Sequence, residues 1–129
     1  MRIEHIAIWT ENLELLKDFY IRHFGCKVSD RYENPSKQFA SYFLAFEEGA
    51  RIEIMTRTGI KSNTEPPVVG LAHFAILVES RAIVDSFTSK VQLAGVTVAG
   101  QPRVTGDGYY ESVILDPDGN RIEVVASAR

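Results

Sequence analysis

The sequence predicts an α+β fold built from two copies of a β-α-β-β-β module, whose strands form a curved sheet with the helices on its outer face. Two observations support this prediction. Four polar residues and their neighbours occur twice at nearly equal spacing along the 129 residues. In each copy, a run of alternating apolar residues, which is typical of a strand, is followed by an apolar pattern of helical period.

The repeat is clearest at two pairs of histidine and glutamate. His5 and Glu53 are separated by 48 residues, and His73 and Glu123 by 50. The sequence that starts at each histidine is HIAI in one copy and HFAI in the other, and the sequence that ends at each glutamate is GARIE and GNRIE. One half of the chain is therefore interpreted as a copy of the other.

The first module is expected to cover residues 1–57 of a single domain. A strand is predicted at 3–9, and the helix after it has an apolar face that ends at Gly25, where a C-terminal cap belongs. Three short strands then complete the module, and a turn at 47–49 precedes the last of them.

The second module is expected to cover residues 71–129, after a linker at 58–70 that contains two adjacent prolines. Its first strand, at 71–78, precedes a helix that starts at Ser80 and stops at Gly95. The sequence DPDGN at 116–120 has the composition of a turn between the last two strands. The strands after the helix are predicted at 97–99, 110–115 and 121–126.

The composition is that of an ordinary globular protein and excludes several classes of partner. Apolar residues make up 45% of the chain, and 14 basic against 17 acidic residues give a net charge of −3 without a basic run, so neither nucleic acid nor a membrane is expected as a partner. With one cysteine and neither a signal peptide nor a membrane-spanning run, we expect a cytoplasmic protein that acts on a small molecule.

Strand alternation places the repeated polar residues on one face of the sheet, because side chains two residues apart point the same way. Charged side chains in a cavity are costly unless they are paired or bound to a metal. The opposite faces carry an unbroken apolar set suited to packing under the helices: Ile6, Ile8, Ile52, Ile54, Phe74, Ile76, Ile122 and Val124.

Two imidazoles and two carboxylates make a ligand set for a divalent transition metal. If the two modules pack about a pseudo-two-fold axis, His5, Glu53, His73 and Glu123 surround one point, and the curved sheet encloses a metal-containing cavity. A metal held in this way can chelate neighbouring oxygens of a substrate while a carboxylate moves an adjacent proton.

Structural roles, rather than catalytic ones, are expected for several other residues. Arg51 and Arg121 are expected to be salt partners at the strand ends, and His23 to pack on its helix or reach solvent. Cys26 has no neighbouring histidine or CxxC partner, so a buried or inert thiol is expected. The loop at 105–110 is either a lid over the cavity or a long turn.

With these motifs, the chain resembles the vicinal-oxygen-chelate superfamily, which includes glyoxalase I, extradiol dioxygenases, methylmalonyl-CoA epimerase and the fosfomycin and bleomycin resistance proteins. The resemblance covers essentially the whole chain. The resemblance rests on the two opening strands that contain a histidine, the helix end with Phe19-Tyr20 and Phe24-Gly25, and the run at 116–123.

The resemblance implies a function. A His-Glu-His-Glu set looks like the compact bacterial glyoxalase I, or lactoylglutathione lyase, which is a homodimer with metal sites shared between chains and which often prefers nickel or cobalt over zinc. The chain is then a metal-dependent lyase or isomerase that transfers a proton through a metal-bound enediolate. By this resemblance Glu123 is the catalytic base and Glu53 its symmetric partner.

Two departures from the glyoxalase I pattern concern the substrate. That enzyme type grips glutathione with an arginine four residues after its first histidine and an asparagine four residues after its first glutamate; here these places hold Trp9 and Arg57. A cavity with Trp9, Met55 and Leu77 beside the cation of Arg57 suits an apolar or aromatic ligand with one anionic group. Activity on a glutathione adduct is therefore doubtful.

Two alternatives from other classes remain open. One is a small-molecule binding protein of the bleomycin-resistance kind, which would use the same fold without a metal. The other is an Fe(II) extradiol dioxygenase, which the fourth ligand Glu53 and the short chain disfavour.

Overall fold

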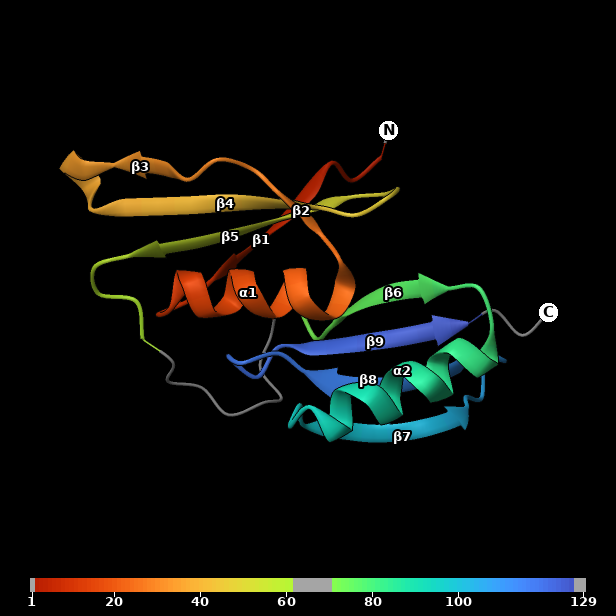
Figure 1. Ribbon diagram of the computed structural model, residues 1–129. Coiled ribbons are helices and arrows are strands. Elements are labelled where there is room, and N and C mark those ends of the chain that lie inside the picture. Colours follow the sequence, from red (N-terminus) through yellow and green to blue (C-terminus); the bar gives the residue numbers. More distant parts are fainter. Residues whose placement is uncertain (1, 62–70, 127–129) are drawn as a thin grey trace. The chain divides into compact units, whose positions relative to one another are not determined.

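The computed structural model describes residues 2–61 and 71–126 (Figure 1). The chain divides into two compact units, Met1–Asn63 and Thr64–Arg129, which we describe one at a time as unit 1 and unit 2. The predicted modules, 1–57 and 71–129, correspond to these units in outline, and most of the predicted linker at 58–70 lies outside the described residues.

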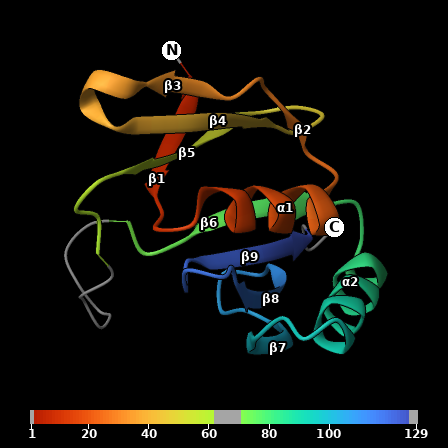
Figure 2. The same ribbon diagram turned by 60° about the vertical axis from the view of Figure 1, so that its left-hand side comes forward.

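Unit 1 consists of one helix and five strands. Its elements in chain order are β1 (His5–Trp9), α1 (Leu13–Phe24), β2 (Lys27–Val28), β3 (Tyr32–Asn34), the 3-10 turn η1 (Pro35–Lys37), β4 (Phe39–Ala45) and β5 (Arg51–Arg57). The strands lie in the order β1-β5-β4-β2, and β3 also pairs with β4. Helix α1 lies along one face of this sheet (Figure 1 and Figure 2).

The core of unit 1 lies between α1 and the sheet. Leu16 and Tyr20 of the helix are fully buried, as are Leu44 and Ile54 of the strands. Full burial of an aliphatic side chain of this size stabilises the fold by about 1.5–3 kcal/mol. The helix packs on the sheet face that the alternation of the sequence predicts to be apolar.

Both ends of α1 are capped by local hydrogen bonds. The side chain of Asn12 accepts a hydrogen bond from the backbone N–H of Leu15 at 3.0 Å. At the other end Gly25 adopts the left-handed conformation with a φ of 65° and donates its N–H to the carbonyl of Ile21. Glycine reaches this region without the steric cost that other residues incur, so the predicted helix end at Gly25 is confirmed.

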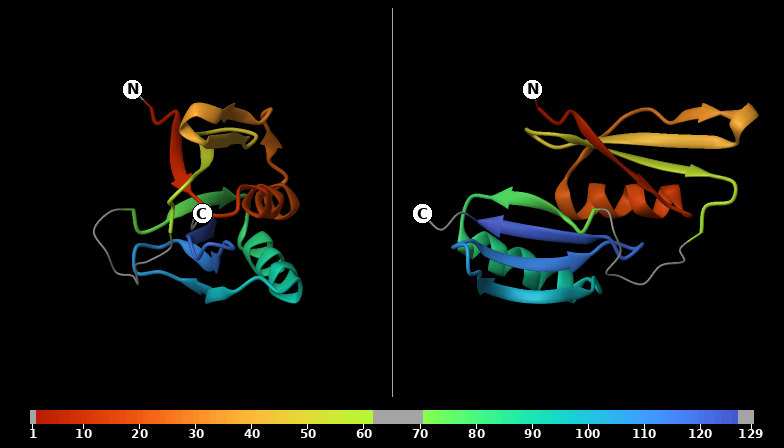
Figure 3. Two further views of the ribbon diagram at one scale, coloured as in Figure 1. Left: turned by 90° about the vertical axis from the view of Figure 1, so that its left-hand side faces the viewer. Right: turned by 180° about the vertical axis from the view of Figure 1, so that it is seen from behind.

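Unit 2 repeats the plan with one helix and four strands. Its elements are β6 (Phe74–Val78), α2 (Arg81–Leu93), β7 (Val98–Val104), β8 (Tyr110–Leu115) and β9 (Arg121–Ala126). The strand order is β6-β9-β8-β7, with α2 on one face of the sheet (Figure 3). The predicted start of α2 is confirmed, because the Ser80 side chain caps the N–H of Ile83.

The two sheets share one topology. The first strand of each unit pairs in parallel with the last, β1 with β5 and β6 with β9, and the last strand then pairs antiparallel with the one before it. The last strand therefore lies inside the sheet in both units. The predicted ranges of β8 and β9 agree with the structure residue for residue.

Unit 1 differs from the predicted module at its second strand, the one that follows the helix. The segment after α1 is divided into β2 and β3, both of which pair with β4. In unit 2 the corresponding strand, β7, is continuous and longer than the predicted range of 97–99, although its register to β8 shifts twice. Such shifts mark β-bulges, which disturb the apolar alternation from which strand ends are predicted.

The loop after β7, which the sequence leaves open as a lid or a turn, is a compact turn. The backbone N–H of Thr105 donates to the carbonyl of Tyr109 at 2.8 Å, and the Thr105 hydroxyl accepts from the N–H of Tyr109 at 3.1 Å. Gly108 sits between them with a φ of 91°. These bonds join β7 to β8 as a hairpin.

The predicted α+β class with two β-α-β-β-β modules is confirmed by these elements. Neither α1 nor α2 is long and apolar enough to cross a membrane, and the same holds of every helix in the described part of the chain.

Candidate metal centre

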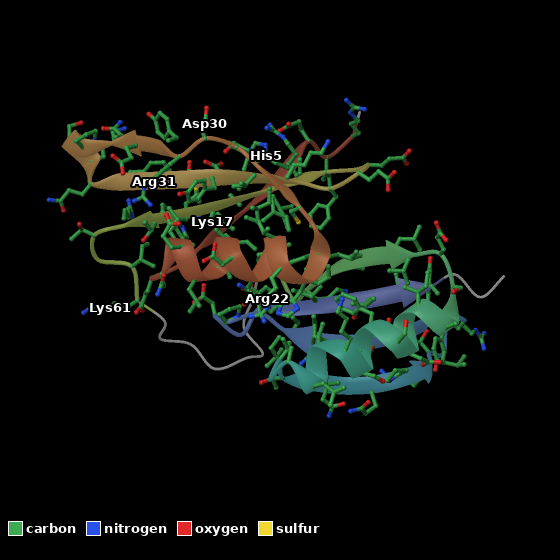
Figure 4. The ribbon with its side chains drawn as sticks, in the orientation of Figure 1. His5, Lys17, Arg22, Asp30, Arg31 and Lys61 are labelled. Carbon is green, nitrogen blue, oxygen red and sulfur yellow. The ribbon has the colours of Figure 1, made fainter. Side chains whose placement is uncertain are left out.

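Each unit brings one histidine and one glutamate together. In unit 1 the Nε2 atom of His5 lies 3.8 Å from Oε2 of Glu53, and in unit 2 the Nε2 atom of His73 lies 3.3 Å from Oε2 of Glu123. In both pairs the glutamate belongs to the last strand, and the histidine lies at the start of the parallel strand beside it. His5 can be located on β1 in Figure 4.

The geometry of both pairs fits a shared metal ion. Zinc bonds to imidazole nitrogen and carboxylate oxygen are each about 2.0–2.2 Å long, so one ion can contact two ligand atoms that are up to about 4.2 Å apart. Both observed N···O separations lie below this limit. The glutamates are the more buried partners, because the side chains of Glu53 and Glu123 are 17% and 20% exposed. The side chains of His5 and His73 are 39% and 43% exposed.

Each unit by itself supplies only two of these ligands. In residues 2–61 and 71–126, no three His, Cys, Asp or Glu side chains gather closely enough to hold a metal ion. The four-ligand set predicted from the sequence requires the two pairs to meet around one ion, and it stays a prediction.

Glu4 orients the imidazole of His5. Its carboxylate contacts Nδ1 of His5, which leaves Nε2 directed at Glu53. The same carboxylate accepts a hydrogen bond of 2.7 Å from Nε of Arg51. The hydrogen bond with His5 lowers the pKa of Glu4 most strongly; burial opposes this effect, and the hydrogen bond and charge of Arg51 lower the pKa further.

This arrangement corresponds to the carboxylate–histidine–metal triads of metalloproteins, in which a carboxylate fixes the tautomer of a ligating histidine. It also confirms Arg51 as a salt partner at the start of β5. On the other side, the ring of His5 meets the ring of Phe43 edge-on with centroids 5.4 Å apart. In unit 2 the place of Glu4 is taken by Ala72.

Glu123 is placed by its strand and by the turn before it. Strand β9 is hydrogen-bonded on both sides, with Ala75 of β6 and Val113 of β8 opposite Glu123. The turn before β9 is tied by Asp116, whose carboxylate accepts hydrogen bonds from the backbone N–H groups of Asp118 and Asn120 at 3.0 and 2.9 Å. The predicted turn therefore sets the register of β9 against β8, and this register determines the position of Glu123 in the sheet.

Glu111 is a further carboxylate on the Glu123 face of unit 2. It lies two residues along β8 from Val113, which is opposite Glu123, and is itself opposite Val125; only 9% of the residue is exposed. Burial raises the pKa of Glu111, and the negative charge of Glu123 raises it further. The mostly exposed guanidinium of Arg103, 4.0 Å away, lowers the pKa of Glu111 and offsets this rise only in part.

The raised pKa of Glu111 predicts a pH-dependent effect on stability. A carboxyl whose pKa is higher in the folded state stabilises the fold below its unfolded pKa, and this contribution is lost as the pH rises through the folded pKa. We expect Glu111→Gln to increase the free energy of unfolding of the metal-free protein at pH 7.5, and the gain to shrink as the pH falls below the ordinary carboxyl range. Urea titrations at pH 7.5 and pH 4 measure the difference.

The control for this prediction is Glu48→Gln, which changes an exposed carboxyl in the turn before β5. Its effect on the free energy of unfolding should be small at both pH values. A Glu111→Gln variant that is less stable than the wild type at pH 7.5 would contradict the prediction.

Three of the four predicted substrate-binding residues lie together in unit 1. Trp9 is opposite Met55 in the β1–β5 register, and the guanidinium of Arg57 lies 5.0 Å from the centroid of the Trp9 ring. The fourth, Leu77, is 72% exposed on β6 of unit 2. All four lie on the same sheet face of their unit as the His–Glu pair.

The remaining predicted residues have structural positions. The ring of His23 packs against that of Phe19 with centroids 4.9 Å apart, which agrees with the packing role expected for it. Cys26 is a buried free thiol, and burial raises its pKa to about 11, so its thiolate is scarce at neutral pH. Arg121 begins β9 with its side chain exposed.

Two candidate functional residues, Glu111 and Glu4, are not identified from the sequence, for different reasons. Glu111 could have been found, because a turn centred on Asp118 pairs Leu115 with Arg121 and so places Glu111 on the Glu123 face. Glu4 could not, because it lies before the start of β1, has no copy in the second module, and reaches His5 only through its side chain.

Comparison with known proteins agrees with this architecture. The family model described as Glyoxalase/Bleomycin resistance protein/Dioxygenase superfamily matches residues 2–124. A lactoylglutathione lyase of Arabidopsis thaliana is 26% identical over 128 residues, which are 96% of this chain and 44% of that protein. The chain spans less than half the length of the two lactoylglutathione lyase relatives that it matches over nearly its whole length.

Two solved structures share the fold over nearly the whole length of both chains. A glyoxalase family protein from Enterococcus faecalis has a TM-score of 0.79 and 26% identity, with 96% of each chain covered. A glyoxylase/bleomycin resistance protein/dioxygenase domain from Frankia sp. EAN1pec has a TM-score of 0.84 and 16% identity, with 98% of each chain covered.

Proposed function

Because the chain belongs to the Glyoxalase/Bleomycin resistance protein/Dioxygenase superfamily, we propose that it is a divalent-metal-dependent lyase or isomerase of the glyoxalase type. The observation that carries this proposal is the His–Glu pair that occurs at the same place in both units, at ligand spacing each time. Among the relatives, proteins named lactoylglutathione lyase support a lyase reaction.

We propose that His5, Glu53, His73 and Glu123 hold one nickel, cobalt or zinc ion. The ion would act as a Lewis acid toward two neighbouring oxygens of the substrate. Glu4 would keep His5 in the tautomer that presents Nε2, since its carboxylate contacts Nδ1.

The proton transfer is assigned to the carboxylates. One Oε atom of Glu123 would take the proton from a hydroxyl-bearing substrate carbon beside a carbonyl group and return it to the carbonyl carbon. The hydroxyl proton would move to the former carbonyl oxygen, so that the substrate is isomerised without net change of protons. Glu53 is its counterpart in the other unit. Both side chains are at least four-fifths buried, which limits the access of water to the proton in transit.

The test is a metal analysis followed by an activity panel. The protein as purified is analysed for nickel, cobalt, zinc and iron, stripped, reloaded with each metal and assayed with several thiols and 2-oxoaldehydes. We expect turnover that depends on the added metal and weak or no activity on the methylglyoxal adduct of glutathione. Metal-free protein that is as active as the loaded protein would refute the proposal.

A second candidate function is metal-independent binding of a small molecule, as in bleomycin resistance proteins. The observation in its favour is the exposed group of Trp9 and Arg57, which is formed by unit 1 without any ligand from unit 2. Stoichiometric ligand binding to a protein that takes up no metal would favour this candidate.

We also propose a cytoplasmic homodimer. In the described sheets β1 pairs with β5 alone and β6 with β9 alone, so each sheet has an open edge strand, and open edges need cover. The reduced, buried Cys26 suits a reducing compartment. Light scattering at micromolar concentration should give twice the mass of the 129-residue chain, whereas a monomer with full metal occupancy would contradict a site shared between chains.

A further inference from the structure

Unit 1 carries three aromatic rings and an arginine on the sheet face opposite α1. We call this group, Trp9, Tyr32, Phe39 and Arg57, the aromatic face. The ring centroids of Trp9 and Phe39 are 6.2 Å apart, and those of Phe39 and Tyr32 are 6.0 Å apart, both edge-to-face. Contacts of this geometry hold the rings in place, so a fixed apolar surface exists before any ligand binds.

The aromatic face is open to solvent. Trp9 is 42% exposed and Tyr32 is 55% exposed, although both are large and apolar. A ligand with a planar or aliphatic body would bury this surface, and the hydrophobic gain would favour binding.

Arg57 adds a cation that has no ion-pair partner in the part of the chain that the structure describes. In residues 2–61 and 71–126, no carboxylate lies within ion-pair distance of Arg57, although its guanidinium is held 5.0 Å from the Trp9 ring. By contrast, Arg51 on the same strand contacts the carboxylate of Glu4, and Arg31 pairs with Glu14 and Glu33. The donors of Arg57 can therefore serve an external anion.

The spacing along β5 sets the length of the ligand. Glu53, Met55 and Arg57 follow each other on one face, and a strand rises about 3.3 Å per residue, so Arg57 lies about 13 Å along the strand from Glu53. Met55, opposite Trp9, lies between them. The strand thus presents a proposed metal ligand, an apolar middle and a cation in that order.

We propose that the aromatic face binds the far end of the substrate, which is an elongated molecule with an aromatic or apolar body and one carboxylate or other anionic group on Arg57. This inference rests on the proposed function for the near end, where the reacting oxygens meet the His5–Glu53 pair. Binding of the far end itself needs no metal.

The experiment uses Trp9, the one tryptophan of the chain, as the reporter. Metal-free full-length protein is titrated with 4-phenylbutyrate and with its neutral amide, and the emission excited at 295 nm is followed. We expect a saturable change for both probes, with the carboxylate bound roughly ten- to a hundredfold more tightly, as a charge-assisted hydrogen bond predicts. Arg57→Met should remove this preference and leave the affinity for the amide unchanged.

The matched control is Arg51→Met. Arg51 also lies over an aromatic ring, 4.2 Å from the centroid of Phe43, on the same strand and face, but its guanidinium contacts the carboxylate of Glu4. This variant should keep the preference for the carboxylate. Equal effects of the two variants, equal binding of the two probes by the wild type, or no saturable change at all would overturn the inference.

The outcome of this binding experiment can be interpreted independently of the activity panel that tests the proposed function. Loss of the carboxylate preference in Arg57→Met together with absence of metal-dependent turnover would refute the lyase and keep the aromatic face as an anion-binding surface. Metal-dependent turnover together with an unchanged preference in Arg57→Met would keep the lyase and refute the role of Arg57. Circular dichroism checks that both variants are folded, as expected for changes at side chains on the sheet surface.

Discussion

Replacing His73 by alanine is expected to abolish stoichiometric binding of nickel, cobalt or zinc. His73 supplies the only imidazole near Glu123, at 3.3 Å, among the described residues of unit 2. Loss of an outer-shell partner already costs about 10–100-fold in metal affinity, so loss of a ligand itself should cost more. Elemental analysis after gel filtration, with isothermal titration of the stripped protein, measures the change.

The chain offers a matched control, since it has three histidines. His23 lies on α1 with its ring against Phe19, on the opposite side of the sheet from the His5–Glu53 pair. A His23→Gln variant should keep one metal ion per site. Unchanged metal content in His73→Ala would remove the four-ligand hypothesis.

The second large effect is expected at Asp116. Replacing it by alanine should lower the free energy of unfolding by about 2–4 kcal/mol, because hydrogen bonds to a charged group are worth about 1.5–3 kcal/mol and the N–H donors of the turn would lose their acceptor. The Asp116 carboxylate is buried and accepts from the N–H groups of Asp118 and Asn120 and, at 2.8 Å, from Nδ2 of Asn120. Urea unfolding at constant m-value measures the loss.

Two further variants decide whether the hydrogen bonds cause this loss. Asp116→Asn keeps an oxygen at the place that accepts both backbone bonds, so it should recover most of the stability. Asp30→Ala removes an exposed aspartate of unit 1, labelled in Figure 4, and should change stability by no more than about 0.5 kcal/mol. An Asp116→Ala variant as stable as Asp30→Ala would show that the turn does not depend on its carboxylate.

Much of the fold follows from the sequence because two simple signals agree. Alternation assigns the faces of β5 and β9, and the structure buries Ile52, Ile54, Ile122 and Val124 on the side of the helices as predicted. Cap residues set the helix limits, and the turn before β9 sets the register of the last hairpin. The internal repeat then supports each of these predictions a second time.

The parts of the site that the sequence misses depend on side chains rather than on backbone pattern. Glu4 reaches His5 and Arg51 from outside the strand, so no alternation marks it. Phe39 of β4 contacts the ring of Trp9, and Tyr32 of β3 contacts the ring of Phe39. Strand β3 follows a break in the second strand of the module that the second module lacks. The proposed meeting of the two His–Glu pairs around one ion would depend on how one unit packs on another, which no local signal of the sequence encodes.

The place of the last strand inside each sheet has a consequence for synthesis on the ribosome. Strand β5 joins β1 to β4, so the sheet of unit 1 is incomplete until residues 51–57 have emerged. At roughly 5–20 residues per second, the 48 residues between His5 and Glu53 take about 2–10 s to translate. Throughout this interval the nascent chain presents the imidazole of His5 without the carboxylate of Glu53, so the proposed metal site could form only after the sheet is complete.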